Sequence, residues 1–277
     1  MSTIEKHTIV ISSSNTHGRY FHDLWSYRDL LFFLSWRDIL VRYKQTVIGI
    51  AWAVVRPLLT MLIFSFVFGR IAKLPSSGTA YPLMVFSAML PWYFFAGALT
   101  DSSNSLLVNS NMISKVYFPR LLIPASTIAV SLVDLGISLV IMLGLMAWYG
   151  VWPTFRILAL IPLIVIAITA ALGLGLWFAA LNVRYRDFRY IVPFITQIGL
   201  YVSPVGFSST VIPEHWRLAY SINPMVSVID GFRWALLDTN TDLYFPGIIL
   251  SLAVIFILLA SGIWYFRRTE NTFADEI

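Results

Sequence analysis

The sequence predicts an all-α integral membrane protein with six transmembrane helices. Of its 277 residues, 58% are hydrophobic and 12% are charged, and one soluble core cannot bury such a composition. The apolar residues come in blocks of about twenty, the length at which a helix crosses a hydrocarbon layer about 30 Å thick. The alternating ten-residue segments of a membrane β-barrel are not found. Helical spans therefore account for most of the chain.

Composition also excludes several classes of chemistry. The chain has no cysteine, so thiolate chemistry and disulfides are excluded. All four histidines lie outside the expected spans, and we predict no catalytic or metal-binding residue. None of the four lysines follows a glycine, which excludes a phosphate-binding Gly-x-x-x-x-Gly-Lys loop. The net charge of +5 includes no run of Lys and Arg typical of nucleic-acid binding. We expect no cofactor in this chain, and any nucleotide energy has to come from a partner.

The apolar blocks place the six spans along the chain. They are expected at Val47–Phe68, Pro82–Thr100, Leu121–Trp148, Ile157–Leu181, Ile191–Phe207 and Phe245–Tyr265. Residues 208–240 contain a further apolar stretch, but Asn223-Pro224, Asp230-Gly231 and Arg233 interrupt it. Such interruptions favour short helices that dip into the membrane or cover its outer face. Residues 47–266 would thus form one membrane domain.

Positive charge sets the expected orientation. Six spans return Arg267 and Arg268 to the side of Arg184, Arg186 and Arg189, whereas a seventh span would place them outside. Eleven Lys or Arg residues then flank the spans on the cytoplasmic side and five on the outer side. We therefore predict a multi-pass protein of the cytoplasmic (inner) membrane with both termini inside, including polar tails at residues 1–23 and 267–277.

Residues 24–46 mix aromatic side chains with basic and acidic ones, including Arg37 and Arg42. This composition suits an amphipathic helix at the cytoplasmic headgroup layer. The charges do not gather on one face of an unbroken helix, which predicts either a break near Ser35 or cover by another protein.

Residues 109–120 form a short basic and aromatic passage between the second and third spans. Asn109 and Asn111 are suited to cap a short helix, and Pro119 and Pro124 limit its length. The residues support two interpretations equally, a handle for a soluble partner or an ordinary loop.

Two ionisable residues fall inside spans, Arg56 in the first and Asp134 near the middle of the third. Because buried charges are costly in a membrane, the two either pair or face a polar lumen separately, or Arg56 extends to the inner interface. In the second span, Trp92, Tyr93 and Phe95 are suited to line a carbohydrate path, with core packing at least as well supported. These five residues are the candidate channel residues.

In the fourth span, Ala171-x-x-x-Gly175-x-x-x-Ala179 predicts close helix packing.

Several stretches together resemble one family of transporters. They are Arg37-Asp-Ile-Leu-Val-Arg-Tyr-Lys-Gln-Thr-Val-Ile-Gly-Ile-Ala-Trp52, Arg56-Pro57, Leu90-Pro-Trp92, Val116-Tyr-Phe-Pro-Arg120, Asn182-Val-Arg-Tyr-Arg-Asp-Phe188 and Ile222-Asn-Pro224 through Arg233. The chain resembles the ABC-2 type permeases that export O-antigen, capsular polysaccharide or teichoic acid.

The resemblance implies a homodimeric permease with two separate ATPase subunits, which hold ATP and Mg²⁺, and a lipid-linked polysaccharide as substrate in contact with membrane lipid. It implies a coupling helix at 109–120 and outer gate helices at 208–240. The implied coupling residues are Arg37, Arg42, Asn111, Lys115, Tyr117, Phe118, Pro119 and Arg120, and the implied gate residues are Asn223, Pro224 and Arg233.

The alternative from another class is a carrier or channel subunit driven by an ion gradient, or a purely structural subunit. Asp134 is its main support. Such carriers usually contain more intramembrane acids and histidines, and often an inverted repeat, neither of which we find here.

Overall fold

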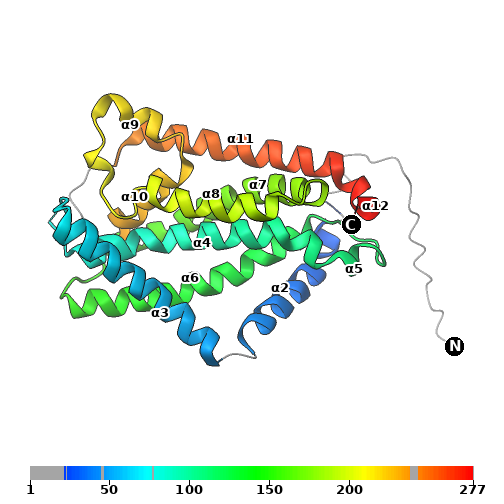
Figure 1. Ribbon diagram of the computed structural model, residues 1–277, viewed down its shortest axis with the longest axis horizontal. Coiled ribbons are helices and arrows are strands. Elements are labelled where there is room, and N and C mark those ends of the chain that lie inside the picture. Colours follow the sequence, from blue (N-terminus) through cyan, green and yellow to red (C-terminus); the bar gives the residue numbers. More distant parts are fainter. Residues whose placement is uncertain (1–21, 23, 45–46, 77, 238–242, 277) are drawn as a thin grey trace.

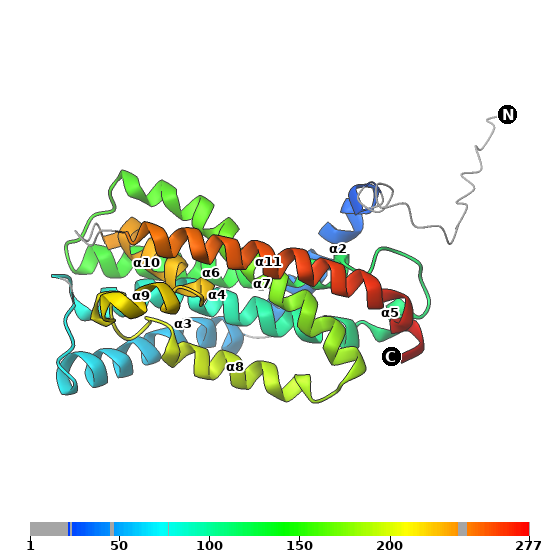
Figure 2. The same cartoon turned by 90° about the horizontal axis from the view of Figure 1, so that it is seen from above.

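The computed structural model describes residues 22, 24–44, 47–76, 78–237 and 243–276, and every regular element in these ranges is helical (Figure 1). The predicted all-α class is thereby confirmed. The long helices run lengthwise along an elongated bundle, as Figures 1 and 2 show from two directions. Helices α5 and α12 lie at one end and α9 lies at the other. We refer to these as the α5 end and the α9 end.

Five of the predicted spans have long helical counterparts. These are α3 (Val47–Phe64) with the π-helix η1 (Ser65–Ile71), α4 (Tyr81–Val108), α6 (Leu122–Trp148), α7 (Leu160–Arg184) after the 3₁₀ helix η2 (Phe155–Ala159), and α11 (Phe245–Thr269). The shorter elements are α2 (Arg28–Tyr43), α5 (Ser110–Ile113), α8 (Phe188–Val202), η3 (Ser209–Val211), α9 (Glu214–Tyr220), α10 (Pro224–Leu237), η4 (Glu270–Thr272) and α12 (Phe273–Glu276).

The described residues contain five helices long and apolar enough to cross a membrane, and α8 is a shorter apolar helix. Its 15 residues extend about 22 Å, against a hydrocarbon thickness of about 30 Å. The predicted fifth span, Ile191–Phe207, is therefore helical only as far as Val202. Ser203 is extended because it precedes Pro204, and a residue before proline disfavours the helical conformation. The count of six spans stays a prediction.

Helix α4 is the centre of the bundle. Within its apolar window 78% of the residues are buried, against 17–28% in the other four long helices, and it contacts α3, α6, α7, α8 and α10. It continues eight residues past the predicted end at Thr100 because the polar residues that follow have partners. The hydroxyls of Ser103 and Ser105 donate to backbone carbonyls of α4 itself, and Asn182 of α7 donates to the Ser103 carbonyl.

Small residues allow α7 to approach two neighbours closely. Ala171, Gly175 and Ala179 are buried, and a side chain at Gly175 would clash with Ser102 of α4. At the contact between α7 and α11, a Cβ atom added to Gly262 of α11 would lie 2.4 Å from the carbonyl oxygen of Gly173 in α7. The close packing predicted from the sequence motif is confirmed.

We expect Gly262→Ala to destabilise the protein, although alanine normally favours a helix. The new methyl group would press on the rigid backbone of α7, and such overpacking costs typically about 1 to 3 kcal/mol. Gly144→Ala in α6 is the matched control, because no atom lies within 4 Å of the position of its Cβ. Thermal unfolding in detergent measures the difference, and equal melting temperatures would contradict the described contact between α7 and α11.

Helix α2 is continuous from Arg28 to Tyr43, so the predicted break near Ser35 is wrong. Its polar side chains meet partners of the same chain instead. Ser35 donates to the Ser126 carbonyl at 3.4 Å and Tyr43 donates to Asp134, which places α2 alongside the first half of α6 and running in the same direction. Helix α6 covers one side of α2, and cover of the exposed side by another protein stays a prediction. Residues 45–46 of the predicted interface helix and most of the predicted tail at 1–23 lie outside the described residues.

Candidate functional site

The segment 109–120 is a helix only at Ser110–Ile113, and the residues that follow form turns. The helix is therefore shorter than the predicted 109–120, and Pro119 disfavours the helical conformation only in Phe118, the residue before it. Asn109 does not cap α5. Its amide nitrogen donates to the Ser105 carbonyl at 2.9 Å, and its amide oxygen accepts from Arg37 at 2.8 Å. Asn109 thus ties the end of α4 to α2.

The side chains that follow α5 divide into an exposed and a buried group. Tyr117 is 69% exposed and Phe118 only 4%. Asn111, Lys115 and Val116 are also exposed, whereas Pro119 is buried and Arg120 is half-buried with one guanidinium nitrogen, Nη1, inaccessible. Direct contact with a partner is therefore a prediction for Asn111, Lys115 and Tyr117, while Phe118 supports the segment from inside.

Phe118 belongs to a separate hydrophobic core, which we call the α5-end cluster. Its buried members are Leu106, Ile113, Phe118, Leu122, Ile123, Leu176, Ala179, Ala180, Val183, Phe266 and Phe273. Side chains from the N-terminal region, among them Tyr27 and Leu31, pack against it. Residues 267–276, within the stretch 267–277 expected to be a polar tail, continue α11 and then form η4 and α12.

Arginines of α2 connect it to the transmembrane helices. Arg37 binds Asp38 at 2.7 Å in addition to Asn109. Arg42 binds Asp101 of α4 at 3.2 Å and Asp134 of α6 at 2.9 Å. Both predicted coupling arginines of α2 therefore bind residues of their own chain, and these contacts join α2 to α4 and α6.

The partner of Asp134 differs from the sequence alternatives. Arg42 and Tyr43 bind it, whereas the guanidinium of Arg56 lies over the ring of Tyr93 at 5.9 Å. Burial, followed by the hydrogen bond to Asp134, raises the pKa of Tyr43, so its hydroxyl stays a donor at physiological pH. Sequence reasoning missed Tyr43 and Asp101. The sequence did contain a signal for Asp101, because this acidic residue directly follows the apolar second span.

We expect Arg42 and Asp134 to be energetically coupled. Asp134→Ala should lower the free energy of unfolding by about 1 to 2 kcal/mol, since it removes a partly exposed ion pair and the acceptor for Tyr43. Arg42→Ala in the same background should then cost less than it does alone. Thermal unfolding of the single and double variants measures this. Asp29→Ala is the control, because Asp29 is an exposed acid of α2. Strictly additive losses would contradict the pairing.

The three candidate channel aromatics belong to α4. Trp92 and Phe95 are buried in the main core, and the Trp92 ring lies against Gly199 of α8. Tyr93 is half-buried. This placement supports the core-packing alternative for Trp92 and Phe95 and leaves Arg56 as the exposed member of the group.

At the α9 end, the predicted short helices are present as η3, α9 and α10. Asn223 lies between α9 and α10, where its side chain accepts from the Met225 backbone N–H, and Pro224 is the first residue of α10. Arg233 is 6% exposed. Its guanidinium donates to three backbone carbonyls, those of Met84 at 3.2 Å, Val205 at 3.0 Å and Phe207 at 2.8 Å. It fastens the segment after α8 to α4 and α10.

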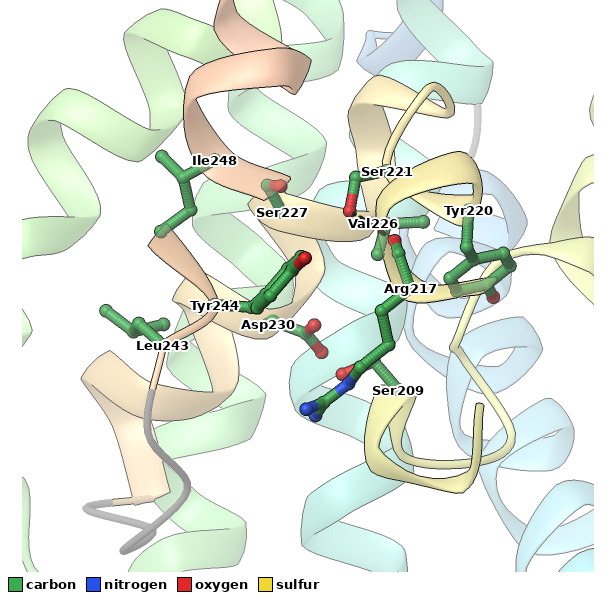
Figure 3. Close-up of a pocket in the computed structure, with 10 residues that line it drawn as sticks. All are labelled: Ser209, Arg217, Tyr220, Ser221, Val226, Ser227, Asp230, Leu243, Tyr244 and Ile248. Atoms are coloured by element: carbon green, nitrogen blue, oxygen red, sulfur yellow. Dashed lines mark hydrogen bonds between the residues drawn. The ribbon is translucent and has the colours of Figure 1, made fainter. Parts of the chain in front are cut away.

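A pocket opens between η3, α9, α10 and the start of α11 (Figure 3). Arg217 lies over the ring of Tyr244 at 5.5 Å, and Figure 3 shows Asp230 and Ser209 beside it. Burial raises the pKa of Tyr220, and the nearby Asp230 acts in the same direction. The pocket therefore offers a guanidinium donor, a carboxylate acceptor and hydroxyl groups within one small space.

In the part of the chain that the structure describes, five long apolar helices packed around and including α4 define a multi-pass membrane protein. The family model described as ABC-2 type transporter matches residues 29–237, and the chain belongs to this family. The resemblance seen in the sequence is confirmed. Members of the family are membrane transport subunits, and the ATPase activity lies in separate subunits.

Curated relatives have similar lengths. The chain is 29% identical to the O-antigen export system permease protein RfbA of Myxococcus xanthus over 94% of this chain and 99% of that protein. It is also 29% identical to an RfbA of Klebsiella pneumoniae over 89% of this chain and 94% of that protein. Identity to the polysialic acid transport protein KpsM of Escherichia coli is 23%, over 85% and 91%.

Proposed function

We propose that the chain is the permease subunit of an ABC exporter that moves a lipid-linked polysaccharide across the cytoplasmic membrane. It works as a homodimer with two copies of a separate ATP-binding subunit, which hold ATP and Mg²⁺. The α5 end and both termini face the cytoplasm. The observation that carries the proposal is the α5 end itself, where Lys115 and Tyr117 are exposed on a segment whose neighbours Ile113 and Phe118 are anchored in a core.

The contacts of this segment provide a route for mechanical coupling. A partner that pushes on Tyr117 moves Asn109, which Arg37 joins to α2. Helix α2 in turn binds α4 and α6 through Arg42. Rigid-body motion of the partner on ATP binding would thus reach three helices at once. The chain itself contributes no ATP-binding loop and only transmits the motion.

The surface of α8 supports the homodimer and its conduit. Among its 15 residues only Val192 is buried, and its exposed side chains include Phe194, Gln197 and Tyr201. The exposed face of α3 beside it contains Arg56. A second copy placed here would enclose a path with both aromatic faces and hydrogen-bonding groups, which suits sugar rings and their hydroxyls. The relatives reported above, O-antigen export permeases and a polysialic acid transport protein, agree with such a substrate.

Tyr117→Ala tests the coupling surface. Loss of an exposed aromatic anchor should weaken the complex with the ATP-binding subunit by about 2 kcal/mol, which is roughly thirtyfold in affinity. Insertion and thermal stability should be unchanged, because the ring contributes to no core. Co-purification of the ATPase and export of polysaccharide are the measurements. Tyr149→Ala is the control, since Tyr149 is an exposed tyrosine that follows the opposite end of α6.

The same preparation separates the exporter from the ion-gradient alternative. Proteoliposomes that contain the permease and its ATPase should export polysaccharide with ATP and without an ion gradient. Gradient-driven transport by the permease alone, together with unaltered export by Tyr117→Ala, would overturn the proposal.

A further inference from the structure

The chain that leaves α11 folds back toward segment 109–120, which we call the coupling segment. After Thr269, η4 and α12 turn the backbone so that the Phe273 ring meets the Phe266 ring edge-on, with 5.2 Å between their centroids and an interplanar angle of 73°. Phe273 is only 1% exposed. In both overall views α12 lies beside α5 (Figures 1 and 2), and the two helices are in contact.

Phe273 shares its packing with the residues that anchor the coupling segment. Ile113 and Phe118 belong to the same α5-end cluster as Phe273, and α12 also contacts α7. The short helix in this segment has little stability of its own. Helix α5 has only four residues, far fewer than the about 12 that an isolated helix needs in water. Its position therefore depends on the packing of these few side chains.

We propose that Phe273 is a positioning residue for coupling, which holds segment 109–120 in the conformation that presents Lys115 and Tyr117 to the ATP-binding subunit. The proposal rests on the proposed function for its consequence in transport. Its structural part, that Phe273 keeps Ile113 packed, stands independently of any substrate. Without the Phe273 ring, one side of the cluster opens and the short α5 loses its support.

The first experiment measures the segment directly, without transport. Because the chain has no native cysteine, a single cysteine at Ile113 reports whether the cluster is closed. Labelling by a membrane-permeant maleimide should accelerate at least about tenfold in the Phe273→Ala background, since truncating a buried phenylalanine removes packing that keeps the cluster closed. Phe273→Leu should restore slow labelling. Phe256→Ala is the matched control, because Phe256 is an exposed phenylalanine of α11, and it should leave labelling unchanged.

The second experiment measures coupling in membranes that contain the ATP-binding subunit. Phe273→Ala should reduce polysaccharide export at least about tenfold while the protein still inserts, and Phe273→Leu should recover most of it. Unchanged labelling at Ile113 would overturn the structural part. Faster labelling with normal export would overturn the role in coupling. If the wild-type chain exports nothing, the proposed function fails, and the labelling result still decides the packing of Phe273.

Discussion

Arg233→Met should be among the most damaging substitutions in the chain, because it removes a buried guanidinium that serves three backbone carbonyls. The carbonyls of Met84, Val205 and Phe207 would lose their donor. Asp230, whose carboxylate lies 3.8 Å away, would lose its nearest cation. Removing one partner of a buried charged network costs about 3 to 5 kcal/mol, a large fraction of a typical stability of about 5 to 15 kcal/mol.

Thermal unfolding in detergent and the yield of monodisperse protein measure this loss. Arg233→Lys should rescue little, because one ammonium on a flexible stem cannot reproduce the planar fork of the guanidinium. Arg70→Met is the control, since Arg70 is an exposed arginine of η1. Similar melting temperatures for the variants at 233 and 70 would show that the described carbonyl contacts do not hold the α9 end together.

Phe118→Ala should lower the free energy of unfolding by about 3 to 5 kcal/mol, because it leaves a cavity in the α5-end cluster. The expectation for its neighbour Tyr117 is the reverse, with unaltered stability and weakened binding of the ATPase. Two adjacent aromatic residues should therefore separate the stability of the segment from its recognition.

The design compares both substitutions in two assays, thermal unfolding of the permease alone and co-purification of the ATP-binding subunit. Phe118→Leu should retain most of the stability, since leucine fills much of the same space. If Phe118→Ala leaves the melting temperature unchanged and Tyr117→Ala lowers it, the orientation of the two rings in the structure is wrong, and Phe118 is the contact residue.

The sequence determined the features that depend on local composition. Apolar blocks and the positions of prolines predicted the helical class, five of the long helices and the break at Asn223-Pro224 between α9 and α10. Motif resemblance predicted the family, which the comparison over residues 29–237 shows. These features are readable because hydropathy and proline geometry act over one or two helical turns.

Only the tertiary structure decided which side chains meet. Asp134 binds Arg42, 92 positions earlier in the chain by the difference of their numbers, rather than Arg56. Phe118 turns inward beside Tyr117, and Phe273 of an expected polar tail is buried with it. Such choices depend on which helix faces come together, and the helical period alone leaves several faces equally suited to a charge or a ring. Packing around α4 selected one arrangement because buried charges and carbonyls require partners and apolar rings exclude water.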